Sequence, residues 1–324
     1  MQRRPLGHTD LVISPIGIGA WAMGGGGYQF GWGPQSDEES IAAIHRAVDL
    51  GINWIDTAPV YGLSRAEEVV ARALAGLAPS RRPYVFTKCS LVWDEQGTIS
   101  HSLEPASLRR EVETSLRRLR TGTIDLYQIH WPAFRRGDPS PGLEEAWRTL
   151  ADLQRAGTVR HIGVSNFDER HLARVEAIAP VASLQPPYSM LNRGIEARVL
   201  PWCQSHGVGV IAYSPMQSGL LSGTMTRERV AALPQDDWRS RGGLEFREPR
   251  LSRNLALVER LRDLGRAHGK SPAEVAIAWT LRHPGVTAAI VGARRPAHVD
   301  GFIGAGEWRL TQREIEDIES WLSA

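Results

Sequence analysis

The sequence predicts an α/β protein, a (β/α)₈ TIM barrel formed by one domain over residues 1–324. Short apolar segments rich in β-branched residues alternate with helical patterns from one end of the chain to the other. There are eight such segments, and they are apolar on both faces, as the strands of a parallel sheet are. No Gly-x-Gly-x-x-Gly motif opens a helix after the first segment, so an open Rossmann sheet is the weaker interpretation.

The predicted strands lie at 16–20, 52–56, 84–88, 123–130, 159–166, 181–185, 208–214 and 286–292. Helices are predicted between them, for example at 36–51, 107–122 and 142–157, each ending at a glycine. The turn residues Gly7 to Asp10 predict a small N-terminal β-hairpin at the floor of the barrel. After the seventh strand, residues 215–250 have a weak pattern and predict a long loop, which in a compact domain is usually functional or mobile.

Composition excludes several classes of protein. The net charge is +2 and the arginines are scattered, which is consistent with small phosphate-bearing ligands but does not indicate a nucleic-acid surface. No apolar run is long enough for a membrane span, and the first residues lack the apolar region of a signal peptide. Cys89 and Cys203 form no Cys-x-x-Cys motif, and no cluster has metal-ligand spacing. These features are typical of a cytoplasmic protein without a metal.

Polar side chains recur at the carboxyl ends of the predicted strands. They are Asp56, Lys88, His130, Ser165, Asn166, Gln185 and Tyr213. Each of these residue types alone is more often structural than catalytic. Because the carboxyl ends of barrel strands meet at one mouth, where active sites are built, the set as a whole predicts a shared site.

The chemistry of four residues points to proton transfer. Asp56 ends an apolar strand, so its charge needs a partner, and Lys88 on the next strand can supply it. Tyr61 lies five residues after Asp56, and a nearby ammonium would lower the pKa of its phenol. A neutral imidazole at His130 could orient a carbonyl oxygen. Tyr61 is therefore the predicted general acid for carbonyl reduction.

Over essentially its whole length the chain resembles the aldo-keto reductase superfamily. The motifs that carry the resemblance are "GINWIDTAPVYG", "YVFTK", "IDLYQIHWP", "IGVSNF", "LQPPYSML", "VIAYSPMQSGLLSG" and "AIVGARRP". The chain is most similar to the bacterial branch related to inositol-utilisation reductases and potassium-channel β subunits. The resemblance implies a (β/α)₈ barrel, NAD(P)H-dependent carbonyl reduction and a catalytic tetrad of Asp56, Tyr61, Lys88 and His130.

The resemblance also implies how the cofactor is held. Nicotinamide contacts are expected from Ser165, Asn166, Gln185 and the stacking ring of Tyr213. The pyrophosphate loop corresponds to Ser214, Ser218, Gly219 and Leu220, and the adenosine phosphate segment to Gly292, Arg294 and His298. An arginine at position 294 favours NADP(H), while NAD(H) stays possible. The chain departs from the family pattern in three places. Thr224 stands where many relatives have a basic residue, His298 where a basic or amide side chain is common, and Gly301 and Phe302 where a Glu-Asn pair commonly holds adenine.

The predicted substrate is a small carbonyl compound or polyol. Trp21, Trp32 and Trp131 lie near the segments discussed above, and they either line an aromatic pocket or serve as packing. Two other functions stay open: a nicotinamide-binding regulatory subunit with little turnover, and a barrel aldolase that uses Lys88 as a Schiff base. Asp56 disfavours the aldolase because it keeps the lysine charged. The sequence does not fix the oligomeric state.

Overall fold

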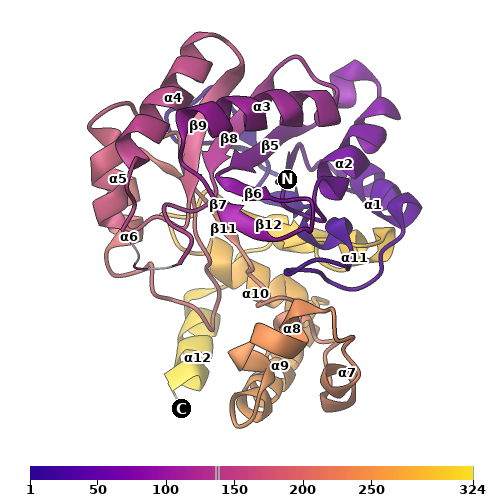
Figure 1. Ribbon diagram of the computed structural model, residues 1–324. Coiled ribbons are helices and arrows are strands. Elements are labelled where there is room, and N and C mark those ends of the chain that lie inside the picture. Colours follow the sequence, from indigo (N-terminus) through magenta and orange to yellow (C-terminus); the bar gives the residue numbers. More distant parts are fainter. Residues whose placement is uncertain (136, 138, 324) are drawn as a thin grey trace.

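The computed structural model describes residues 1–135, 137 and 139–323. Within these residues eight parallel strands form a closed barrel (Figure 1). They are β3 (Ile16–Gly19), β4 (Trp54–Asp56), β5 (Tyr84–Cys89), β8 (Ile124–Ile129), β9 (Val159–Ser165), β10 (Ser183–Gln185), β11 (Gly209–Tyr213) and β12 (Ala288–Gly292). The first and last strands close the barrel by pairing Gly19 with Gly292. Every predicted strand is confirmed.

Helices surround the barrel (Figure 1). They are α1 (Asp37–Asp49), α2 (Arg65–Ala75), α3 (Pro105–Leu119), α4 (Leu143–Arg155), α5 (Glu169–Glu176), α6 (Val199–Ser205), α9 (Arg250–Arg266), α10 (Pro272–Leu281), α11 (Pro296–Asp300) and α12 (Gln312–Ser323), with 3₁₀ turns η1 (Trp21–Gly24), η2 (Pro79–Arg81) and η5 (Ile303–Gly306). Two of the predicted glycine stops are confirmed, because Gly51 and Gly157 take φ angles of 92° and 75° after α1 and α4. The third is wrong: Arg120, with a φ of 53°, already ends α3 before Gly122.

The predicted N-terminal hairpin closes the floor of the barrel. Strands β1 (Arg4–Pro5) and β2 (Val12–Ile13) pair antiparallel. Leu6 and Leu11 are fully buried in one cluster with Trp54 of β4. The Trp54 indole Nε1 donates a hydrogen bond of 2.9 Å to the Ser14 carbonyl. The floor is therefore packed with apolar side chains.

The strand period of two puts the polar layer directly above this floor. Side chains two apart on a strand point to the same face. Apolar residues of the floor cluster are accordingly followed two positions later by polar ones: Trp54 by Asp56, Phe86 by Lys88, and Leu126 by Gln128. The barrel interior is therefore apolar below and polar at the mouth.

Two segments at the mouth were not predicted in this form. Strands β6 (Leu91–Trp93) and β7 (Ile99–His101) make an antiparallel hairpin. The predicted loop at 215–250 contains η3 (Leu220–Ser222), α7 (Arg227–Ala231), α8 (Trp238–Gly242) and η4 (Leu244–Phe246). Figure 1 shows α7, α8 and α9 together on one side of the barrel. Among the described residues, no helix combines the length and apolar character needed to cross a membrane.

Candidate active site

The carboxyl ends of β4 and β5 bring three of the predicted catalytic side chains together. The Lys88 ammonium is fully buried and donates to Asp56 Oδ1 at 2.5 Å and to the Thr57 carbonyl at 2.9 Å. The same Nζ lies 3.3 Å from the Tyr61 hydroxyl. Asp56 therefore offsets the charge of a lysine that points its ammonium at a phenol.

The protonation state of Tyr61 differs from the sequence-based expectation. The predicted lowering of its pKa by Lys88 is not found. Burial and the neighbouring Asp56 charge instead raise the pKa of Tyr61 well above its ordinary value. Burial also lowers the pKa of Lys88, an effect that Asp56 opposes. Tyr61 accordingly keeps its proton at neutral pH, and its hydroxyl is able to donate it.

His130 lies directly after β8, next to the phenol. Its ring meets the Tyr61 ring edge to face, with 5.7 Å between the centroids. Burial and the nearby Lys88 charge hold the pKa of His130 well below its ordinary value. The imidazole is therefore neutral, as predicted, and its N–H can donate to an oxygen in front of Tyr61.

The second oxygen of Asp56 accepts hydrogen bonds from two side-chain amides. Gln185 Nε2 donates at 2.8 Å and Gln128 Nε2 at 3.2 Å. Gln185 was predicted to contact nicotinamide, whereas Gln128 was missed. A signal was present in the sequence, because Gln128 precedes His130 by two residues within the predicted strand at 123–130.

A second polar group follows β9 and β11. Asn166, held at a φ of 63°, donates to the His130 carbonyl at 2.9 Å. Its Oδ1 accepts the Tyr213 hydroxyl at 2.9 Å. Ser165 donates to the Gln185 carbonyl at 2.8 Å. The predicted nicotinamide-binding side chains therefore form one hydrogen-bonded group beside the catalytic residues.

A cleft of about 870 Å³ runs from these residues to the segment after β12. Its lining includes most of the predicted site residues: Trp21, Trp32, Asp56, Tyr61, His130, Trp131, Ser165, Asn166, Gln185, Tyr213, Ser214, Ser218, Gly219, Gly292, Arg294 and His298. Two predicted residues do not line it. Lys88 lies beneath the cleft, and Leu220 is buried in an apolar cluster. No three His, Cys, Asp or Glu side chains of the described residues are grouped as metal ligands.

One wall of the cleft is aromatic. Trp21 stacks on Trp238 with 5.4 Å between ring centroids and meets Trp32 edge to face at 5.1 Å. Trp238 belongs to α8, which lies inside the predicted loop at 215–250, so its place in the cleft was not predicted. The neighbouring Arg239 lies over the Trp32 ring at 4.7 Å and donates to the Ser218 carbonyl at 3.3 Å.

The turn after β11 has an uncommon backbone conformation. Ser214, Gln217 and Ser218 all have positive φ angles, of 56°, 46° and 56°. Such conformations are costly for residues other than glycine and concentrate at ligand sites. The loop lines the cleft at Ser214, Ser218 and Gly219, while the Arg239 guanidinium beside it is paired with the buried Asp237 carboxylate at 2.6 Å. With the amides of Asn166 and Gln185 at one end of the cleft and basic side chains at the other, the residues present fit a nicotinamide cofactor.

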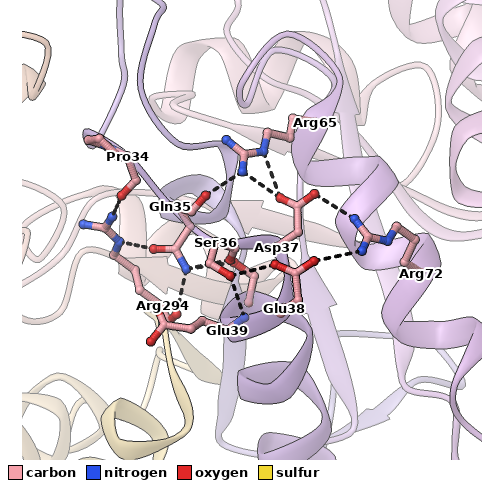
Figure 2. Close-up of polar contacts among 10 residues, drawn as sticks. Pro34, Gln35, Ser36, Asp37, Glu38, Glu39, Arg65, Arg72 and Arg294 are labelled. Atoms are coloured by element: carbon pink, nitrogen blue, oxygen red, sulfur yellow. Dashed lines mark hydrogen bonds and ion pairs between the residues drawn. The ribbon is translucent and has the colours of Figure 1, made fainter.

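At the far end of the cleft, Arg294 holds the chain before α1 (Figure 2). Its Nε donates to Gln35 Oε1 at 2.5 Å, and its Nη1 donates to the Trp32 carbonyl at 3.3 Å. Nη2 donates to the Pro34 carbonyl. Arg294 thus uses three of its N–H groups to hold residues 32–35.

Other basic groups line the same end. Arg229 of α7 and Arg295 were not predicted, and both lie in the cleft lining with His298. The neighbouring arginines add to burial in lowering the pKa of His298. This end of the cleft is therefore positively charged, as a phosphate site requires.

Comparison with known proteins gives a consistent result. The profile of the Aldo/keto reductase family matches residues 15–323. The aldo-keto reductase YhdN of Bacillus subtilis is 35% identical, covering 99% of this chain and 94% of its own. The NADH-specific methylglyoxal reductase of Escherichia coli is 33% identical, covering 94% of this chain and 93% of its own.

A solved structure supports the same family assignment. The glycerol dehydrogenase of Gluconobacter oxydans superposes with a TM-score of 0.88 and 38% identity, covering 99% of this chain and 95% of its own. The side chains grouped around Lys88, the cleft above them and the match over nearly the whole chain lead to the same conclusion. The protein belongs to the aldo/keto reductase family and is an NAD(P)H-dependent oxidoreductase.

Proposed function

We propose that this enzyme reduces an aldehyde, ketone or sugar-like carbonyl to the alcohol, reversibly, with Tyr61 as the general acid. The observation that carries the proposal is the position of Lys88 Nζ, 2.5 Å from Asp56 Oδ1 and 3.3 Å from the Tyr61 hydroxyl. This arrangement stabilises the phenolate that is left when Tyr61 gives up its proton.

Each residue has a separate task in the reduction. When bound, the nicotinamide supplies the hydride that the carbonyl carbon receives. Tyr61 donates its proton to the carbonyl oxygen, and the phenolate then accepts a hydrogen bond from the Lys88 ammonium. Neutral His130 donates a hydrogen bond to the same oxygen and so orients the carbonyl toward Tyr61. Asp56 keeps Lys88 charged and in place. In the oxidative direction, Tyr61 takes the proton back.

The favoured cofactor is NADP(H), and NAD(H) stays possible. The positive end of the cleft, with Arg229, Arg294, Arg295 and His298, supports binding of an adenosine phosphate. Against this, one relative is NADH-specific by name. Gly301 and Phe302 also line this end and offer no side-chain hydrogen bond to adenine.

The substrate class is supported by the aromatic wall of the cleft. Trp21 and Trp238 present flat apolar faces, which suit small aldehydes and the apolar faces of sugars. Two relatives are named for methylglyoxal and for glycerol, one a small carbonyl compound and the other a small polyol. We propose that the substrate of this enzyme is of similar size.

The test is turnover of wild type and Tyr61→Phe, followed by nicotinamide absorbance with aldehydes, ketones, sugars and inositols in both directions. We expect Tyr61→Phe to lose about 10²–10⁴-fold in turnover, the usual contribution of a general acid. Cofactor affinity, measured by fluorescence titration, should barely change. A Tyr61→Phe enzyme with near-wild-type turnover would disprove the mechanism. A wild type that binds the cofactor but turns over none of these substrates would favour the regulatory subunit instead.

A further inference from the structure

We propose that Gln128 is a positioning residue that holds Asp56 and the Gln185 amide in one hydrogen-bonded unit. Through this unit, Gln128 affects both the residues proposed to transfer the proton and the proposed binding of nicotinamide by Gln185. The inference rests on the proposed function, because it concerns the same reaction.

Gln128 sits at the centre of the polar layer. It lies on β8, is fully buried and is in register with Lys88 of β5. Its Nε2 donates to Asp56 Oδ2 at 3.2 Å, and its Oε1 accepts from Gln185 Nε2 at 3.3 Å. Gln185 Nε2 also donates to the same Asp56 oxygen at 2.8 Å. The three side chains form a closed ring of hydrogen bonds.

The ring fixes the orientation of both amides. A carboxylate without its proton only accepts hydrogen bonds, so the NH₂ groups of Gln128 and Gln185 must both face Asp56. The Gln128 oxygen then takes the second hydrogen of the Gln185 NH₂ group. As a result, Gln185 commits both of its donors to the interior of the barrel.

Because both N–H donors of Gln185 are used inside the barrel, its amide oxygen is the atom that can bind a ligand in the cleft, which Gln185 lines. An amide oxygen accepts hydrogen bonds, and the carboxamide NH₂ of nicotinamide donates them. Without Gln128, one hydrogen of the Gln185 NH₂ group loses its acceptor, and the hydrogen bond to Asp56 alone holds the amide. Asp56 at the same time loses one of the donors that hold the carboxylate beside Lys88.

The first experiment compares Gln128→Leu with Ser183→Ala. Ser183 is a buried residue of β10, two positions before Gln185, and its hydroxyl has no hydrogen-bond partner among the described residues. Ser183→Ala therefore removes a buried polar group at the same face without breaking a hydrogen bond. Both variants are titrated with NADPH and with 2′-phospho-ADP-ribose, which lacks nicotinamide, and likewise with NADH and ADP-ribose.

We expect Gln128→Leu to weaken binding of the whole dinucleotide and to lower kcat, each by about 10- to 100-fold, as for the loss of hydrogen bonds to a charged group. Binding of the nicotinamide-free fragments should be unchanged, and Ser183→Ala should match wild type in every measurement. Equal weakening of dinucleotide and fragment would show a merely structural role and overturn the inference, as would a Gln128→Leu enzyme with wild-type kcat and affinity.

The second experiment uses Gln128→Glu, which has the same shape. When protonated, a glutamic acid can donate to Asp56 and accept from Gln185, so it reproduces the ring. When ionised, it repels Asp56. The charged or titratable groups around the position are Asp56 of β4, Lys88 and Cys89 of β5, His130 after β8 and Tyr61. Asp56 is hydrogen-bonded to the Gln128 side chain, and the Cys89 thiol donates to the Gln128 backbone carbonyl at 3.4 Å. We expect the kcat of Gln128→Glu, relative to wild type, to fall as pH rises. A ratio that does not vary with pH would contradict the proposal.

The two proposals fail in different ways. If Tyr61→Phe keeps its turnover, the proposed function is wrong whatever Gln128 does. If Tyr61→Phe is inactive while Gln128→Leu behaves as Ser183→Ala does, only the role of Gln128 is wrong.

Discussion

The Asp56 carboxylate meets the lysine with one oxygen and two amides with the other. It is 2% exposed, so its charge is tolerable only because all of these donors are present. Removing one donor leaves a buried charge that is incompletely paired.

Lys88→Met tests this dependence. We expect the free energy of unfolding to fall by roughly 3–5 kcal/mol, the usual result of removing one partner from a buried pair. Turnover should also be lost, because the phenolate at Tyr61 is no longer stabilised. Urea unfolding of Lys88→Met and of the double variant Asp56→Asn/Lys88→Met provides the measurement. The double variant should be the more stable of the two; the reverse order would mean that Asp56 does not depend on the lysine.

Of the predicted catalytic residues, Asp56, Lys88 and His130 were recognisable because each stands at the end of an apolar strand, and Tyr61 because it follows Asp56 by five residues. The raised pKa of Tyr61 could not be predicted from the sequence, since it depends on how the fold buries the phenol beside Asp56. Gln128 was missed for a related reason: its importance comes from two partners on other strands, 72 and 57 residues away along the chain.

At the scale of elements, α3 packs a half-buried carboxylate, that of Glu111, against the outside of the barrel. Glu111 accepts hydrogen bonds from the Ser90 backbone at 2.9 Å and the Ser107 hydroxyl at 3.0 Å. Burial raises the pKa of Glu111 from 4.5 to about 7. The folded chain therefore holds this proton to a higher pH than the unfolded chain does.

Replacing Glu111 by Gln should change how the free energy of unfolding depends on pH. The contribution of the protonated carboxyl is complete below pH 4.5 and is lost as pH rises through about 7. We expect wild type to lose stability between pH 5 and 8, on the order of 1–3 kcal/mol, relative to Glu111→Gln, whose amide keeps the hydrogen-bonding shape without a charge. The measurement is the urea unfolding midpoint of both proteins across this pH range. If the two midpoints change with pH in the same way, the prediction is wrong.

The chain before α1 is fastened from both sides. Figure 2 shows Arg294 at one end of it and Arg65 and Arg72 of α2 at the other. Arg65 donates to the Gln35 carbonyl at 2.6 Å and pairs with Asp37 at 2.7 Å. Arg294 accordingly has two tasks to separate: holding this chain and, in our proposal, binding the adenosine phosphate.

Arg294→Ala and Gln35→Ala separate them. If Arg294 contacts the phosphate, its loss should weaken NADPH binding by about 10–150-fold, as for a charge-assisted hydrogen bond, and leave NADH binding nearly unchanged. Gln35→Ala breaks the contact in Figure 2 but keeps the charge, so it should keep the NADPH affinity. Fluorescence titrations that find equal affinity of wild type for both nicotinamides would sink the NADP(H) assignment. If Gln35→Ala reproduces Arg294→Ala, the arginine acts only on the chain.

The helices within 215–250 could not be predicted from the sequence, because they are five residues or fewer and are held by contacts to distant segments. For example, the Trp238 backbone donates to the Gly31 carbonyl at 2.9 Å. A helix this short has no periodicity to read, whereas α1, with its capping Ser36, was predictable.

At the scale of the whole molecule, the barrel has an apolar floor that stabilises the fold and, above it, a mouth that holds the proposed active site. Trp54 is fully buried in the floor, with its ring centroid 5.2 Å from that of Phe86. It contributes packing and a hydrogen bond but lies one layer below the catalytic residues.

Trp54→Ala should therefore cost stability without changing the chemistry. We expect a loss of about 3–5 kcal/mol, typical of truncating a large aromatic side chain in a core. Turnover per folded molecule should stay close to wild type. Denaturant unfolding and active-site-normalised kcat test the two halves separately, and a stable Trp54→Ala enzyme with impaired kcat would reverse the assignment.

The seam between β3 and β12, paired from Ala289↔Ile16 to Gly292↔Gly19, bears on how the protein is made. On the ribosome, β3 is complete long before β12 exists. Until β12 is made, the nascent sheet keeps a strand edge with unpaired N–H and C=O groups, which other chains can bind. Such sequence-distant pairing also slows folding. The cleft, which extends to residues beyond β12, therefore forms only in the final stage of synthesis. Just before that stage, the unpaired strand edge is the part of the nascent chain that chaperones need to cover.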